Sequence, residues 1–182
     1  LGFHVILTDN SWDNIRQARM LGLSVYYGNP VSEHADRYLN VKGVGSVMAL
    51  TAERNFNLMA FLHFRHVFER SVVYILSTLP EDLRHKDKIS NSHKDRLLFN
   101  HDITYHRFAK MLEQGGQIKT FEVTESCSWL KICQDYPGCI LLLKKTRRNQ
   151  LVICRAAAEE SIHAGQTVVC LVSADALDSG TT

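Results

Sequence analysis

The sequence predicts a mixed α/β chain, in which a partial parallel sheet is followed by a small α+β unit with a mostly antiparallel sheet. Two observations predict this order. In the first half, short apolar runs alternate with amphipathic helical segments, which is typical of parallel strands joined by helical crossovers. After Gly116 the apolar runs become closely spaced and follow a period of two, which indicates antiparallel strands.

The first half is expected to hold four strands and three helices. β-branched and aliphatic runs predict strands at residues 4–8, 24–27, 46–50 and 71–76. Helical spacing predicts helices at 12–21, 32–39 and 54–70, the first capped by Asn10 or Ser11 and ended by Gly22. The helix over 54–70 has apolar residues on more than one face, so we expect it to pack on two sides or to form a subunit contact.

Residues 78–100 are polar and charged, and they predict a linker or a mobile surface segment. Beyond it, a helix from about Tyr105 ends at Gly115-Gly116, and a second short helix is expected at 127–135. Strands are expected at 118–123, 139–143, 151–154 and 167–172, the middle two forming a hairpin. The predicted division is therefore a nucleotide-binding type domain at 1–78, a linker at 79–100 and a small C-terminal domain at 101–182.

Composition excludes several classes of protein. The net charge of +2 gives no case for binding nucleic acid, and no apolar run approaches the roughly 20 residues of a membrane span. The five cysteines form no C-x-x-C pair and are odd in number, which favours reduced, mostly buried thiols in the cytosol. No G-x-S-x-G or glycine-rich cysteine motif occurs, so we expect no catalysis by a serine or cysteine nucleophile.

Residues suited to ligand binding follow three of the expected parallel strands. Asp9 ends the first strand, where open α/β sheets bind ligands, although a cap for the helix near Ser11 is the alternative. Gly28, Asn29 and Pro30 follow the next strand, with a plain turn as the alternative. Leu50 and Thr51 end the third strand. Three strand ends with suitable chemistry together predict a binding edge.

A dinucleotide-binding unit places a glycine-rich turn about 20 residues before the acid that contacts the ribose. Here eight residues precede Asp9, and G-x-G-x-x-G occurs nowhere in the chain. We therefore expect the first strand and the phosphate-binding loop of a partial, Rossmann-like sheet to lie upstream of Leu1, and the central strand to be supplied by a partner chain or left as a gap.

The segments "VILTDNSWDNIRQARMLGLSVYYGNPVSE" and "SVMALTAERNFN" resemble the TrkA-N type, or RCK-like, nucleotide-binding domain. The segments "LLFNHDITYHRFAKMLEQGGQIKTFEVTE" and "LVICRAAAEESIHAGQTVVCLV" are similar to the cytosolic tail of bacterial NhaP-type sodium/proton antiporters. The resemblance implies a non-enzymatic regulatory region of a monovalent cation/proton antiporter. It would lie at the cytoplasmic face of the plasma membrane, as a homodimer joined to a membrane transport domain of the same polypeptide.

The same resemblance implies roles for individual residues. Asp9 would contact the adenosine ribose, and Leu50 and Thr51 would line the ligand. Asn10, Gly28, Asn29 and Pro30 would surround the adenine of NAD(H), AMP or ATP. The alternatives are a gating subunit of a potassium channel or uptake system, a dimerisation module with a vestigial site, and a nicotinamide-dependent oxidoreductase, for which no acid/base residue can be named.

Two further clusters have ordinary explanations that we favour. His63 and His66 share a helix face with Glu69 and lack the remaining ligands of a metal site. Lys144, Lys145, Arg147 and Arg148 gather at the expected hairpin tip, where a solvated turn is the simpler interpretation than contact with anionic lipid.

Overall fold

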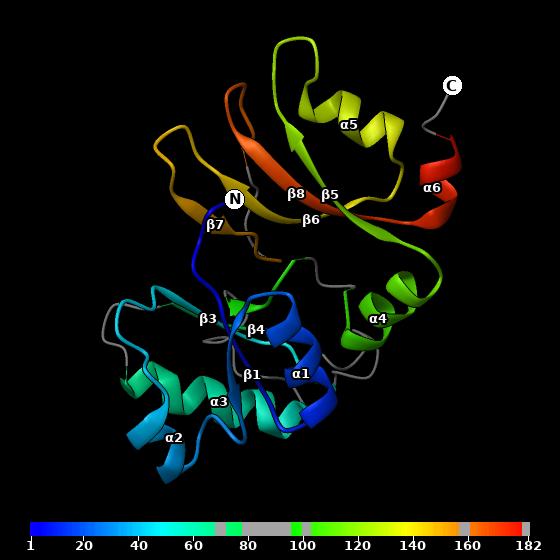
Figure 1. Ribbon diagram of the computed structural model, residues 1–182. Helices are drawn as coiled ribbons and strands as arrows, with labels where there is room; N and C mark the ends of the chain where they lie inside the picture. Colours follow the sequence, from blue (N-terminus) through cyan, green and yellow to red (C-terminus); the bar gives the residue numbers. More distant parts are fainter. Residues whose placement is uncertain (68–71, 78–95, 100–102, 157–160, 180–182) are drawn as a thin grey trace, which may run out of the picture. The chain divides into compact units, whose positions relative to one another are not determined.

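The computed structural model describes residues 1–182 apart from 68–71, 78–95, 100–102, 157–160 and 180–182 (Figure 1). It has two compact units, one formed by Leu1–Ala49 with Asn55–Val73 and one by Leu50–Arg54 with Tyr74–Thr182. Parallel strand pairing in the first and an antiparallel sheet in the second confirm the predicted α/β class. The predicted division at 78 and 100 stays a prediction, because most of the expected linker lies outside the described residues.

The first unit begins with a parallel strand pair joined by a helical crossover. Strands β1 (Ile6–Asp9) and β2 (Ser24–Tyr27) run in register from Ile6 opposite Ser24 to Asp9 opposite Tyr27. Helix α1 (Trp12–Met20) connects them and starts at Ser11, whose hydroxyl accepts a hydrogen bond from the Asn14 amide. It buries Ile15 and Ala18, four and seven residues after its cap, so one face of the helix packs inward.

The remaining elements near the first unit are α2 (Glu33–Tyr38), β3 (Ser46–Ala49), α3 (Arg54–Val67) and β4 (Val72–Ile75). Strand β3 pairs with β4, so the described strands of the first half form two separate two-stranded sheets. Helix α3 buries Ala60, Phe61 and Phe64 on one face. Met59 and Leu62 on the rest of the helix are 49% and 44% exposed, so the expected second packing face or subunit contact stays a prediction.

The second unit is built on a four-stranded antiparallel sheet of order β5-β8-β6-β7. Its strands are β5 (Gln117–Glu122), β6 (Ile140–Lys145), β7 (Leu151–Ile153) and β8 (Thr167–Val172). The expected hairpin is confirmed, because β6 pairs with β7. Its described helices are α4 (Tyr105–Glu113), α5 (Trp129–Asp135) and α6 (Ala174–Ser179), and the sequence pattern had not predicted α6.

Strand β8 is the centre of this sheet, paired with β5 on one side and β6 on the other. Val168, Cys170 and Val172 are fully buried on one of its faces and pack with Ile132 of α5 and Ala176 of α6. Figure 1 shows α5 beside the sheet, where it covers this face. The strand predicted at 167–172 has the same bounds as β8. The prediction succeeded because a strand buried on both faces forms a nearly continuous apolar run, whose ends are easy to locate in the sequence.

Two leucines near the end of the expected linker belong to the buried part of the second unit. Leu97 is 5% exposed and forms a parallel bridge with Ile75, while Leu98 is 0% exposed and forms an antiparallel bridge with Arg155. The amide of Leu98 donates to the carbonyl of Ile75 at 3.0 Å. These residues are therefore ordered by both apolar burial and backbone hydrogen bonds.

Replacing Gly116 with alanine is expected to destabilise the second unit. A Cβ there would lie 2.5 Å from the carbonyl oxygen of Met111 and 3.0 Å from that of Val172, and both are backbone atoms that cannot turn away. Such overpacking costs about 1–3 kcal/mol in the free energy of unfolding. Urea unfolding followed by Trp129 fluorescence, in a Trp12→Phe background, would measure it.

Gly45→Ala is the matched control, because nothing lies within 4 Å of its added Cβ. Equal losses of stability in Gly116→Ala and Gly45→Ala would contradict the close approach seen at Gly116.

Candidate functional site

The carboxyl ends of β1 and β2 form one edge, where five of the predicted site residues lie. Asp9 is opposite Tyr27 in the parallel register, and the amide of Gly28 donates to the carbonyl of Asp9 at 2.9 Å. The loop with Asn10 and the loop with Asn29 therefore leave the sheet from adjacent positions. This is the edge at which open parallel sheets bind ligands.

The carboxylate of Asp9 is already hydrogen-bonded by the chain itself. One oxygen accepts the amide of Ser11 at 2.8 Å, and the other accepts the side-chain amide of Asn14 at 2.8 Å. Ser11 is the cap residue of α1, and Asp9 supports this cap by accepting the Ser11 amide and the Asn14 side chain. A carboxylate offers about four acceptor positions, so these two bonds leave room for a ligand hydroxyl.

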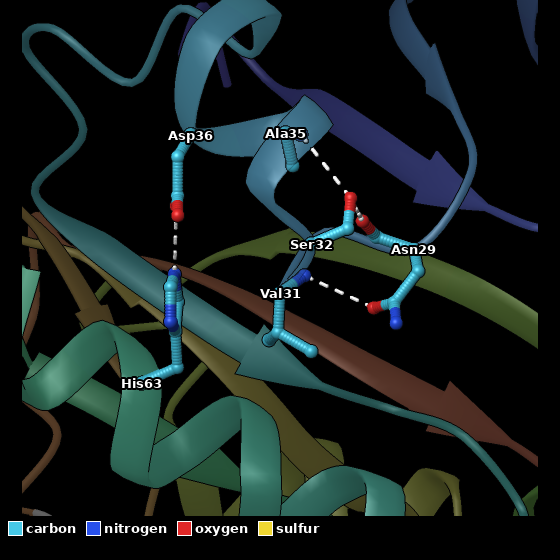
Figure 2. A network of polar contacts seen from close by, with 6 residues as sticks. All are labelled: Asn29, Val31, Ser32, Ala35, Asp36 and His63. Carbon is cyan, nitrogen blue, oxygen red and sulfur yellow. Dashed lines mark hydrogen bonds and ion pairs between the residues drawn. The ribbon is translucent and has the colours of Figure 1, made fainter.

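The loop after β2 is a tight turn held by its own polar groups. Gly28 has a φ of +134°, a conformation that side chains rarely adopt, and an added Cβ would meet the ring of Tyr26 at 3.5 Å. Figure 2 shows the side-chain oxygen of Asn29 accepting the amide of Val31, at 3.0 Å. The carbonyl of Asn29 accepts the hydroxyl of Ser32, which caps α2.

Asn29 thus holds the loop with its oxygen, while its side-chain NH₂ group points away from that bond in Figure 2. Asn29 and Asn10 are exposed, whereas Pro30 is buried beneath the turn. The proposed contacts of these residues with adenine stay predictions. Of the three, the exposed asparagines have the accessibility that a base contact needs.

An aromatic pair at the same edge was not predicted from the sequence. Trp12, the first residue of α1, meets Tyr27, the last of β2, edge to face with ring centroids 5.4 Å apart. The two side chains are 54% and 53% exposed, and the guanidinium of Arg19 lies 6.0 Å from the Trp12 ring. The register between β1 and β2 is what brings Tyr27 beside the start of α1, and the sequence alone does not give that register.

Leu50 and Thr51 follow β3 and are grouped with the second unit, so the edge described above is that of β1 and β2 alone. Leu50 is 43% exposed. The hydroxyl of Thr51 accepts the amide of Glu53 at 3.2 Å, just before α3 begins. Both residues stay predictions as ligand contacts.

His63 and the basic hairpin have structural partners. His63 lies 3.3 Å from the carboxylate of Asp36, a pairing between α3 and α2 that Figure 2 shows. Among the described residues no group of three or more His, Cys, Asp or Glu could hold a metal ion. Lys144 is buried and donates to the carbonyl of Ser161, and Arg147 donates to that of Ala164, which favours the structural interpretation of the hairpin tip.

Comparison with known proteins gave solved structures only. No family profile matches the chain, and no curated protein matches it. The structure of the GsuK channel bound to NAD matches with 14% identity and a TM-score of 0.38, covering 96% of this chain and 33% of that one. The GsuK RCK domain matches with 12% identity and a TM-score of 0.34, covering 96% and 44%.

This chain thus spans less than half the length of these structures. A likeness at this level leaves function to be argued from the residues themselves. In the described part of the chain, no helix combines the length and the apolar character needed to cross a bilayer.

Asp9→Ala is expected to lower the stability of the first unit, because the start of α1 loses two hydrogen bonds at 2.8 Å. Losses at helix caps are about 0.5–2 kcal/mol in the free energy of unfolding. Urea unfolding followed by Trp12 fluorescence, in a Trp129→Phe background, would measure the change. Asn10→Ala is the control, since Asn10 is an exposed neighbour; an equal effect of both would argue against capping by Asp9.

Proposed function

We propose that this chain is the nucleotide-sensing regulatory region of a monovalent cation (sodium or potassium)/proton antiporter. It would act at the cytoplasmic face of the plasma membrane, joined to the transport domain of the same polypeptide, and would catalyse no reaction. The observation that supports this best is the hydrogen-bonded carboxylate of Asp9 at the shared end of β1 and β2. The resemblance of the surrounding segments to TrkA-N domains supports the choice of ligand.

The residues present fit the adenosine end of NAD(H), AMP or ATP. Asp9 keeps acceptor positions for a ribose hydroxyl, and Gly28 has no side chain to obstruct an approaching ring. Asn29 has an exposed amide for a base edge. The sequence contains no glycine-rich phosphate loop, so the proposal for these residues is confined to adenosine recognition.

Sensing requires that the nucleotide bind two arrangements of the region with different affinities. The ligand shifts the equilibrium between them by that difference and by no more. The antiporter would respond to the shift. The ligand supplies binding free energy only, and the residues at the strand ends hold and orient it.

A dimerisation module with a vestigial site is the second candidate, and a specific observation favours it. Both carboxylate oxygens of Asp9 accept donors from the chain, which is a complete structural role without any ligand. A gating subunit of a potassium channel or uptake system shares the first-half motifs and would share the nucleotide site.

Adenosine, AMP and NADH are expected to raise the melting temperature of residues 1–182. A ligand at 100 times its dissociation constant adds about 2.7 kcal/mol to the free energy of unfolding. Asp9→Asn keeps an acceptor for the Ser11 amide and removes the charge that strengthens a hydroxyl's hydrogen bond, so we expect weaker binding by roughly tenfold. Differential scanning fluorimetry with isothermal titration would measure both effects.

Asp13→Asn is the matched control, because Asp13 is an exposed acid in the first turn of the same helix. Unchanged binding in this variant and weakened binding in Asp9→Asn would support the site. No melting shift with any of the three ligands would contradict the sensing proposal and favour the dimerisation module.

The exposed stripe of α3 is the proposed homodimer contact. Met59 is 49% exposed, Leu62 is 44% exposed and Val67 is 47% exposed, and the first two lie three residues apart on one face. Met59→Glu with Leu62→Glu is expected to convert a dimer to a monomer, because an apolar contact would bury two charges. Light scattering after gel filtration would measure the mass, and Met20→Glu on α1, where Met20 is 71% exposed, should leave the dimer intact. A wild-type monomer at all concentrations would overturn the contact.

A further inference from the structure

Two exposed aromatic rings lie at the edge of the first unit where the nucleotide is proposed to bind. Trp12 begins α1 and Tyr27 ends β2, and their ring centroids are 5.4 Å apart with an interplanar angle of 84°. The two side chains are 54% and 53% exposed. Tryptophan is highly buried on average, so a half-exposed aromatic pair at this edge needs an explanation.

The register of the strands places this pair beside Asp9. Tyr27 is directly opposite Asp9 in the parallel pairing of β1 and β2, and residues at such positions point to the same face of a sheet. The carboxylate of Asp9 accepts the amide of Ser11 and the side-chain amide of Asn14. These donors belong to the cap and the first turn of α1, and the same turn carries Trp12. The carboxylate and the two rings therefore share one side of one edge.

Trp12 continues the buried face of α1 beyond the point at which that face is covered. Ile15 is 0% exposed and Ala18 is 6% exposed, and Trp12 lies one turn before Ile15 on the same side of the helix. The change from a fully buried isoleucine to a half-exposed tryptophan marks where the cover of this apolar face ends among the described residues. The face thus leaves room for a flat ligand at the start of the helix.

The geometry of the pair leaves ring faces open. In an edge-to-face pair, the edge of one ring covers a single face of the other. The guanidinium of Arg19 lies over the Trp12 ring, 6.0 Å from its centroid, and covers at most one more face. These contacts leave at least two of the four ring faces of Trp12 and Tyr27, and the exposure of both side chains shows that solvent reaches the pair.

We propose that Trp12 and Tyr27 form a stacking platform for the base of the nucleotide whose ribose Asp9 contacts. This inference rests on the nucleotide-binding function proposed above, and it adds the means by which the site holds the base. Aromatic side chains are suited to this role because every base presents a π-face. Gly28 follows Tyr27 directly and has no side chain to obstruct a ring that approaches the platform.

The platform predicts the class of ligand that the edge selects. A purine offers a larger ring face than a pyrimidine, so adenosine should bind more tightly than cytidine, and ribose alone should bind more weakly than either. Stacking does not read the edge of the base, so discrimination between adenine and guanine is left to the exposed side-chain amide of Asn29. The selected ligand is a purine nucleoside or nucleotide, in preference to a sugar phosphate.

The test is the fluorescence of Trp12 in residues 1–182, in a Trp129→Phe background that leaves Trp12 as the single tryptophan. Excitation outside the absorption of the nucleoside ensures that any loss of fluorescence comes from binding. We expect adenosine to quench the fluorescence along a saturation curve that matches the dissociation constant from isothermal titration. Ribose at the same concentrations should leave the fluorescence unchanged, because it has no ring to stack.

Substitutions at each ring test the platform separately from Asp9. Trp12→Leu should weaken adenosine binding about tenfold, the usual scale for the loss of a stacked base, whereas Trp12→Phe keeps a ring and should lose less. Tyr27→Leu should also weaken binding, and Tyr27→Phe, which removes only the hydroxyl, should retain more of it. Tyr38→Leu is the matched control and should leave the affinity unchanged, because Tyr38 is a 69% exposed tyrosine of α2 whose ring packs with that of His34.

Two results would overturn the platform, and they can be told apart. If the wild type binds adenosine and both Trp12→Leu and Tyr27→Leu bind it equally well, the nucleotide site stands and the stacking role is wrong. If adenosine causes neither quenching nor a melting shift in the wild type, the proposed nucleotide binding fails and the platform fails with it. The quenching measurement needs no substitution at either ring, so it decides the question even where a leucine variant does not fold.

Discussion

The hydrogen bond from the Gly28 amide to the Asp9 carbonyl, 2.9 Å long, is the constraint on which the candidate site depends. It continues the parallel pairing of β1 and β2 to the last residue of both strands, so two loops leave the sheet at one edge. Gly28 can make this bond because it adopts a φ of +134° before the chain turns towards α2. Without that turn, the polar side chains of the two loops would not share an edge.

Capping and ligand binding at Asp9 need not compete. The amide of Ser11 and the side chain of Asn14 fix the carboxylate of Asp9 in one orientation, which would lower the entropic cost of binding the proposed nucleotide. The sequence predicted the edge from the strand ends, and it named both capping and ribose contact for Asp9. It did not identify Asn14 as a partner, because that contact depends on how the first turn of α1 meets the strand.

The elements that were predicted correctly are those that residues close to them in sequence determine. The cap at Ser11 and the strands at 24–27 and 167–172 appear as expected, because turn and cap residues within a few positions determine them. The packing of Cys139 against the core cluster that contains Cys170 was not predicted, since the two residues are distant in sequence and come together through the register of β6 with β8. That register also shifts between Leu141 and Leu143, an irregularity that hydrophobic period alone does not show.

Strands β1 and β8 are buried to different degrees, and the number of their strand neighbours contributes to the difference. Strand β8 has a partner on each side and is buried over nearly its whole length. Strand β1 has two apolar residues, Ile6 and Leu7; it is only half-buried throughout, and its described strand partner is β2. A parallel strand with an apolar run is typically covered on both faces and paired on both edges. The half-burial of β1 therefore agrees with the expectation that a further strand pairs beside it, and that expectation stays a prediction.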